Sequence, residues 1–209
     1  APEGWRDDED ALWAAFTQAA PEALALIAEK TPLQFELTKE PDPMAEYAGG
    51  KDRGRMLSPG AIARSVAGPF GKHIRRSTLP HIFTYGEVQQ YGPYSHPLRA
   101  GIRLLPRLVC RWLTGSRGQG NALVAGLASG CLEQGCEIEL NSRVTALVQD
   151  EVGTVTGVEV ERGGRQETVL ARRGVVLASG GFEWDDALRE QHFPGPFDRI
   201  GSPRTNTGD

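Results

Sequence analysis

The stretch V-V-L-A-S-G-G-F-E-W, residues 175–184, decides the fold. Val175–Ser179 form a mainly apolar run, which is typical of a central strand that is covered on both faces of a sheet. Gly180 and Gly181 follow at once, and a glycine pair opens backbone N–H groups to a phosphate or a planar ring because no Cβ intervenes. A simple tight turn after a strand explains the motif at least as well when it is taken alone.

The residues before this strand have the order of an α/β nucleotide-binding domain. Residues 118–135 carry Leu123, Leu127 and Cys131 at helical spacing, with Gly135 as a C-terminal stop. Four strand-like runs follow, and the last three are separated by the turn sequences D-E-V-G and R-G-G-R, which favour an antiparallel three-stranded meander. The runs are E-I-E-L at 137–140, R-V-T-A-L-V at 143–148, T-V-T-G-V-E-V at 154–160 and Q-E-T-V-L-A at 166–171.

The pattern of the first hundred residues is typical of an insertion in a domain rather than of a domain with its own sheet. Residues 7–29 have helical spacing, with Pro21 predicted to open a second helix. Residues 31–60 predict a long loop in which L-Q-F-E-L, residues 33–37, is the best strand candidate. Residues 61–97 show no clear period.

A basic helix is predicted after residue 98. Arg99, Arg103, Arg107 and Arg111 recur every four residues, and Pro106 interrupts the pattern. We expect a solvated basic face; the alternative is a surface that grips phosphates or another segment.

Composition and charge narrow the class of protein. The chain has 209 residues, 39% of them hydrophobic and 24% charged, which is enough for a folded core. Its formal net charge of −4 predicts no electrostatic footprint for nucleic acid or an anionic membrane. We find no apolar run of the roughly 20 residues that span a bilayer and no charged-then-apolar leader, so we expect a cytoplasmic protein without a transmembrane segment.

The reactive side chains form no recognised catalytic or metal-binding pattern. Cys110, Cys131 and Cys136 lack metal-ligand spacing, and we expect buried, reduced thiols and no metal. A hydrolase that uses Ser179 is disfavoured because the motif G-x-S-x-G would need glycine where Leu177 stands. No histidine has a partner at a recognised spacing, so the catalytic residues stay unknown. Four tyrosines are candidates for the substrate side, although exposed or packing roles explain them better: Tyr47, Tyr85, Tyr91 and Tyr94.

Five sequence elements in order resemble the FAD-dependent fumarate reductase/succinate dehydrogenase flavoprotein family. They are G-x-x-L-V-x-x-L-x-x-x-x-x-x-x-G, R-V-T-A-L-V, G-V-x-V-E, A-R-R-G-V-V-L-A-S-G-G-F-E and N-T-G-D. The branch that looks most similar contains the 3-ketosteroid Δ1-dehydrogenases. The strong resemblance covers residues 115–209, and a weaker one covers residues 40–60.

This resemblance implies FAD as the cofactor and places particular residues beside it. Val144 would offer main-chain contacts to the adenine. Residues of the glycine segment would pass beside the FAD, and a second loop would face its ribose and flavin end. The first set is Ala178, Ser179, Gly180 and Gly181, and the second is Asn206, Thr207, Gly208 and Asp209.

The resemblance also implies an incomplete domain. The G-x-G-x-x-G unit that holds the pyrophosphate in this family is absent, as is a substrate domain after T-G-D. We therefore expect an α/β fold (α+β as an isolated fragment), an incomplete Rossmann-like FAD-binding domain with a three-stranded antiparallel meander. Residues 1–114 would be a helical and irregular insertion, and residues 115–209 the C-terminal part of the FAD-binding domain.

The implied function is that of an FAD-dependent oxidoreductase that dehydrogenates or reduces a carbon–carbon bond next to a carbonyl, similar to a 3-ketosteroid dehydrogenase or a fumarate reductase. The expected partner is a small carbonyl compound, steroid-like in this branch. Taken alone, the chain is expected to bind FAD weakly or not at all, to be inactive and to self-associate through uncovered surfaces. The alternative is a non-enzymatic α+β module that binds a nucleotide or a protein.

Overall fold

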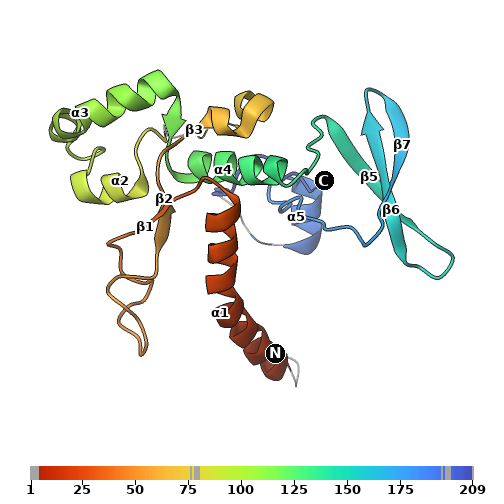
Figure 1. Cartoon of the computed structure of the whole chain (residues 1–209). Helices are drawn as coiled ribbons and strands as arrows, with labels where there is room; N and C mark the ends of the chain where they lie inside the picture. Colours follow the sequence, from red (N-terminus) through yellow and green to blue (C-terminus); the bar gives the residue numbers. More distant parts are fainter. Residues whose placement is uncertain (1–4, 76, 78–80, 194, 196–198, 209) are drawn as a thin grey trace. The chain divides into compact units, whose positions relative to one another are not determined.

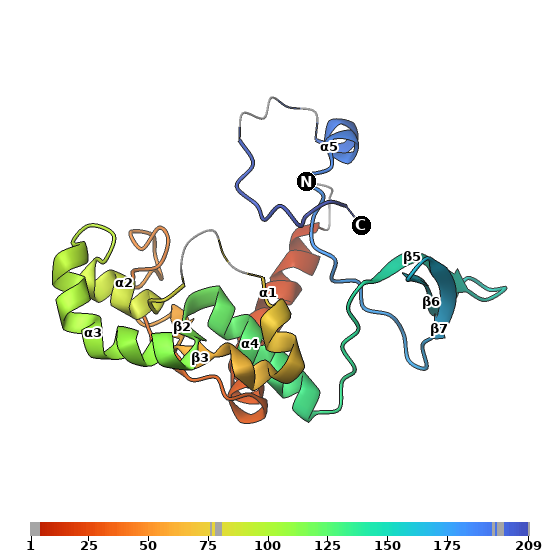
Figure 2. The same cartoon turned by 90° about the horizontal axis from the view of Figure 1, so that it is seen from above.

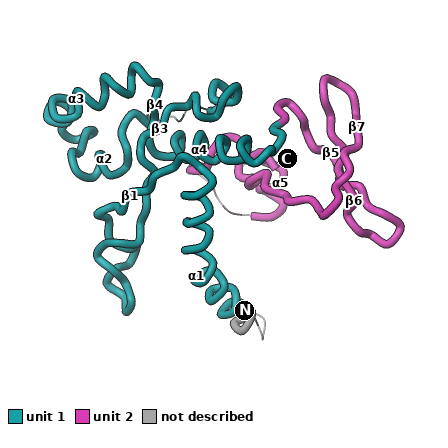
Figure 3. Tube along the Cα trace, viewed as in Figure 1, with its two compact units in different colours: residues 1–138 teal, residues 139–209 magenta. Residues whose placement is uncertain are grey.

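The computed structural model divides the chain into two compact units, Ala1–Ile138 and Glu139–Asp209 (Figure 3). The structure describes residues 5–75, 77, 81–193, 195 and 199–208. The predicted division at residues 114 and 115 concerns the complete family domain and stays a prediction. In the structure, the helix that follows residue 118 belongs to the first unit.

The first unit opens with a single long helix, α1, Trp5–Lys30. The prediction of two helices was wrong, because α1 continues through Pro21. Proline removes only one backbone donor, and the alanine-rich and leucine-rich residues on both sides favour helix strongly. The part Glu9–Lys30 is long and apolar enough to cross a membrane by length and composition alone, which corrects the expectation that no such stretch exists. A core helix of a soluble protein or a signal sequence can meet the same criterion of length and hydropathy.

Short strands and helices follow α1 and surround one further helix, α4, Gln119–Glu133 (Figures 1 and 2). Two small antiparallel pairs, β1 with β2 and β3 with β4, tie distant parts of the unit together. Helices α2 and α3 lie side by side in both views. The bounds are β1 Phe35–Leu37, β2 Leu57–Pro59, β3 Ile62–Ala63, the 3-10 segment η1 Arg64–His73, α2 Tyr85–Tyr91, α3 Pro97–Thr114 and β4 Ser116–Arg117.

The core of the first unit lies around α4. Ala122 and Ala125 are fully buried on this helix, and Leu33 and Ala67 are buried among its neighbours. Glycines let the chain approach α4 closely, because a Cβ at Gly126 would lie 2.3 Å from Leu33 Cγ. The close approach at Gly126 is therefore made by the segment that follows α1.

The second unit contains a three-stranded antiparallel sheet in the order β5-β6-β7. These strands are β5 Ser142–Gln149, β6 Val155–Arg162 and β7 Arg165–Leu170. Gly163 and Gly164 both have positive φ, as a tight two-residue hairpin turn requires. The predicted strand E-I-E-L at 137–140 was wrong: these residues have no strand conformation, and nothing in the described part of the chain pairs with them.

The run Val175–Ser179 is not a strand in this structure, which corrects the prediction of a buried central strand. Val176 is 91% exposed and Leu177 is 68% exposed. A strand needs backbone partners, and no described strand of the chain lies beside this run. The unit continues with a short helix, α5, Asp186–His192.

The three cysteines are free, but the expectation that they are buried was wrong. Cys110, Cys131 and Cys136 are all exposed. Cys131 does not lie on the buried face of α4. That face contains Ala122, Ala125 and Gly126.

Candidate cofactor-binding site

Two segments that lie far apart in the sequence meet in the second unit. The backbone N–H of Gly208 donates to the carbonyl of Gly181 at 3.2 Å, and the N–H of Trp184 donates to the carbonyl of Asn206 at 2.8 Å. The side-chain amide of Asn206 also donates to a carboxylate oxygen of Glu183 at 2.9 Å. The glycine turn, residues 178–181, and the 206–208 loop therefore form one structure.

Glycine is needed at this meeting point because the two segments approach closely. Gly180 has φ +93° and Gly208 has φ +76°, a region of backbone conformation that disfavours other residues. A Cβ at Gly180 would lie 3.1 Å from Asn206 Oδ1, and one at Gly208 would lie 2.5 Å from Leu188 Cδ1. The loop, as well as any ligand, thus explains why side chains are missing here.

The glycine turn fits a dinucleotide on its open side. Ala178, Ser179 and Gly180 are exposed, and within the described part of the chain their N–H groups have no hydrogen-bond partner. Such a row of free amides beside a glycine pair can donate hydrogen bonds to a phosphate or to the edge of a ring. The residues present therefore fit the role that the resemblance implies for FAD.

A hollow of about 400 Å³ adjoins the glycine turn in the same unit. Aromatic and aliphatic side chains line it, together with two arginines, and the hydrogen bond from the indole N–H of Trp184 to the Ser202 carbonyl at 3.0 Å holds one wall. Asp185 caps α5 by accepting from the Leu188 N–H at 2.7 Å. The lining residues are Phe182, Glu183, Arg189, Phe193, Arg199, Ile200, Gly201 and Ser202. None of them is among the site residues predicted from the sequence.

Val144, the residue predicted to meet the adenine, lies on β5. This strand is at one edge of the sheet, so one side of its backbone is open among the described residues. Val144 pairs with Val160, and the register shifts directly after it, between Val144 and Ala146. No hydrogen bond in the described part of the chain joins Val144 to the glycine turn. Asp209, also predicted for the site, lies outside the described residues.

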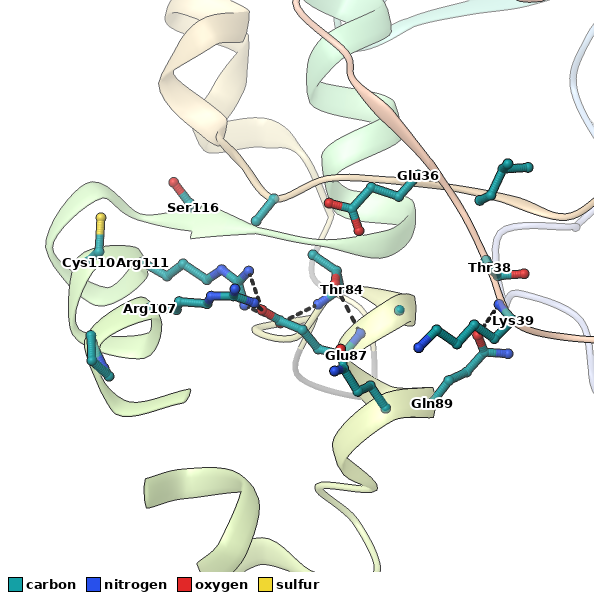
Figure 4. Close-up of a pocket in the computed structure, with 15 residues that line it drawn as sticks. Glu36, Thr38, Lys39, Thr84, Glu87, Gln89, Arg107, Cys110, Arg111 and Ser116 are labelled. Atoms are coloured by element: carbon teal, nitrogen blue, oxygen red, sulfur yellow. Dashed lines mark hydrogen bonds and ion pairs between the residues drawn. The ribbon is translucent and has the colours of Figure 1, made fainter. Parts of the chain in front are cut away.

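The first unit holds a separate cavity of about 650 Å³ between β1, α2 and α3 (Figure 4). Glu87 is one of the residues that line it and is 5% exposed. Its carboxylate accepts from both terminal nitrogens of Arg111, at 2.5 and 3.0 Å, and from Arg107 at 3.1 Å. The predicted solvated basic face was therefore wrong for Arg111, which also donates to the carbonyl of Ile82.

The Glu87 carboxylate stays ionised in this setting. Burial raises the pKa of Glu87, but hydrogen bonds from Arg111 and from the backbone of Thr84, with the charge of Arg111, outweigh it and lower the pKa overall. Thr84 and Glu87 also form a reciprocal capping box at the start of α2. One carboxylate thus joins α2 to α3 and caps α2.

Among the four tyrosine candidates, Tyr85 has the most defined partner. Its hydroxyl donates to the carboxylate of Glu40 at 2.8 and 2.9 Å. This hydrogen bond, aided by burial and by the charge of Glu40, raises the pKa of Tyr85, so the phenol is protonated near neutral pH and suits a donor rather than a base. Tyr47 and Tyr94 are exposed, and Tyr94 contacts Phe83 edge to face.

Comparison with known proteins places the chain in a family. The family model described as FAD binding domain matches residues 3–209. A 3-oxosteroid 1-dehydrogenase from Comamonas testosteroni is 47% identical over 77 residues, which are 37% of this chain and 13% of that protein. A 4-oxocyclohexanecarboxylate 2-dehydrogenase from Sinomonas cyclohexanicum is 29% identical over 177 residues, which are 81% of this chain and 29% of that protein.

The chain is also similar to a protein whose structure has been solved. The crystal structure of 3-ketosteroid delta1-dehydrogenase from Sterolibacterium denitrificans, in complex with 1,4-androstadiene-3,17-dione, is similar with a TM-score of 0.80 and 30% identity. The match covers 93% of this chain and 38% of that one. The chain thus spans well under half the length of these relatives. The resemblance to the FAD-dependent family is confirmed, and the chain belongs to the FAD binding domain family.

Proposed function

We propose that this chain is part of an FAD-dependent dehydrogenase that acts on a carbon–carbon bond next to a carbonyl of a ring ketone, with 3-ketosteroids as the main substrate class. The match to the FAD binding domain family over residues 3–209 carries the proposal. The names of the relatives support the substrate class, because they are dehydrogenases of oxo compounds. FAD, when bound, would serve as the acceptor of a hydride from the carbon beta to the carbonyl.

In this proposal the chain's own residues bind and orient the cofactor. The exposed amides of Ala178–Gly180 face the dinucleotide, and hydrogen bonds from Asn206 to Glu183 and from Gly208 to Gly181 hold the second loop beside this turn. Val144 offers the open edge of β5 to the adenine. The arrangement of these parts as a Rossmann-like domain with a meander, the cytoplasmic location and the self-association of the chain stay predictions.

A chimera tests this function. The 209-residue chain would replace the matched segment of the Sterolibacterium denitrificans enzyme, and the chimera is expected to carry FAD and to lose flavin absorbance when a 3-ketosteroid is added without oxygen. Gly180→Val should weaken FAD binding roughly tenfold, because a forced side chain costs about 1–3 kcal/mol.

A matched control separates cofactor contact from backbone strain. Gly153 has φ +85°, close to the φ of Gly180, and lies in the turn between β5 and β6. Gly153→Val should therefore retain FAD. A folded chimera without FAD would contradict the cofactor site, whereas a chimera with FAD that the steroid does not reduce would contradict the substrate class.

A further inference from the structure

Two of the three free cysteines lie together at the C-terminal end of α4. The helix ends in a Schellman motif, in which the N–H of Cys136 donates to the carbonyl of Cys131 at 2.9 Å and the N–H of Gly135 donates to the carbonyl of Leu132 at 3.0 Å. Gly135 has φ +78°, the left-handed conformation that this motif requires after the helix cap. Cys131 and Cys136 are thus the first and last residues of the motif, and the side chains at these two positions commonly touch.

The backbone hydrogen bond sets an upper limit on the distance between the two cysteines. The Cys136 nitrogen lies 2.9 Å from the Cys131 oxygen. Standard bond lengths on either side of this contact allow at most about 6.8 Å between the two Cα atoms. A disulfide spans a Cα–Cα distance of roughly 4.4–6.8 Å. The end of α4 therefore holds the two residues within the separation that a disulfide bridges.

Both thiols are open to a reagent in solution. Cys131 and Cys136 are exposed, and both are free thiols in the structure. Exposed carboxylates follow them in the sequence, Glu133 two residues after Cys131 and Glu137 directly after Cys136. Negative charges at this distance repel an anionic oxidant such as glutathione disulfide, but not a small neutral one. Hydrogen peroxide is therefore the class of oxidant that suits this site.

We propose that Cys131 and Cys136 form an oxidisable dithiol, which hydrogen peroxide converts to a disulfide across the end of α4. The thiolate of one cysteine attacks a peroxide oxygen, the O–O bond breaks, and water leaves while a sulfenic acid remains on the sulfur. The other thiol attacks this sulfur, the S–O bond breaks as the S–S bond forms, and a second water leaves. The two sulfurs together lose two electrons, which the peroxide gains. This site is independent of the proposed dehydrogenase function.

Treatment of the purified chain with hydrogen peroxide, followed by digestion and mass spectrometry, tests the proposal. Trypsin leaves both cysteines in one peptide, residues 118–143, because no lysine or arginine lies between Arg117 and Arg143. This peptide should lose the mass of two hydrogen atoms. A glutamate-specific protease then cuts after Glu133, between the two cysteines, and the two pieces should stay joined until a reductant is added. C110S should behave like the wild type, whereas C131S and C136S should give no joined pieces.

A glycine variant tests whether the helix end brings the two thiols together. Gly135→Val should slow formation of the disulfide about tenfold, because a β-branched residue disfavours the left-handed conformation that the motif needs. Gly153→Val is the matched control, since Gly153 also has positive φ, +85°, but lies in the turn between β5 and β6 of the second unit. This control should form the disulfide at the wild-type rate.

Four results would overturn the proposal. The thiols could stay reduced in peroxide, or each could gain oxygen without forming a joined pair. The disulfide could include Cys110 or link two copies of the chain, or Gly135→Val could close it as fast as the wild type. Circular dichroism should show that C131S and C136S keep the wild-type fold, because both side chains are exposed.

Discussion

Substitution of Glu87 by alanine is expected to lower the free energy of unfolding of the first unit by about 3–5 kcal/mol. The carboxylate is buried and accepts hydrogen bonds from Arg111, Arg107 and the Thr84 N–H. Its removal leaves the guanidinium of Arg111, whose side chain is 11% exposed, without its counter-charge. It also breaks the capping box of α2. Urea unfolding followed by circular dichroism measures the loss.

The control for this prediction is Glu46→Ala, which removes an exposed carboxylate with no partner among the described residues. It should change the unfolding free energy by less than about 0.5 kcal/mol. A loss of less than about 1 kcal/mol in Glu87→Ala would show that the pair contributes little more than a surface ion pair.

The pH dependence of the unfolding free energy gives a second readout of the same carboxylate. The pKa of Glu87 is lower in the folded chain than its ordinary value of 4.5, so its contribution to stability is present above pH 4.5 and is lost as the pH falls through the lowered pKa. The difference between wild type and Glu87→Ala should therefore shrink below pH 4.5. A difference that stays constant would contradict an ionised Glu87.

Gly118→Ala is expected to lower the free energy of unfolding by about 1–3 kcal/mol. A Cβ at Gly118 would lie 2.5 Å from the carbonyl oxygen of Phe83 and 2.9 Å from Thr84 Cα. Both atoms belong to the backbone, so no side chain can rotate away. The Gly118 N–H also donates to the His81 carbonyl at 2.7 Å, which holds the two segments together. Thermal and urea unfolding measure the effect.

Gly101→Ala is the matched control in α3. A Cβ at Gly101 meets no atom within 4 Å, and alanine favours helix more than glycine does. This variant should be more stable than wild type by up to about 1 kcal/mol. If Gly118→Ala were equally stabilised, the close approach at Gly118 would be absent in solution.

Local sequence signals predicted those elements whose hydrogen bonds are made locally or with the next segment. The helical spacing of residues 118–135 corresponds to α4, and the three runs after residue 142 correspond to β5, β6 and β7. The runs 137–140 and 175–179 failed as strands, because a strand forms only against another strand and no described strand accompanies either run.

In the candidate cofactor-binding site, too, local sequence signals do not predict contacts between segments that are distant in the sequence. The glycines at 180 and 181 were identified from sequence, yet their contact with Asn206 and Gly208 depends on a fold that brings the two segments together. Glu87 had a readable signal, because Thr84 and Glu87 have capping-box spacing. Its ion pair with Arg111 had none, since nothing in either segment indicates that α2 and α3 pack together.

Titration of the isotope-labelled chain with FAD, followed by amide NMR spectra, tests most directly whether the glycine turn and the 206–208 loop face FAD. This measurement detects weak binding and assigns it to residues. We expect saturable shifts at the amides of Ala178–Gly181, Asn206–Gly208 and Val144. The turn glycines Gly153 and Gly163, which also have positive φ, should not shift. Saturable shifts that are confined to other residues would contradict this placement of FAD.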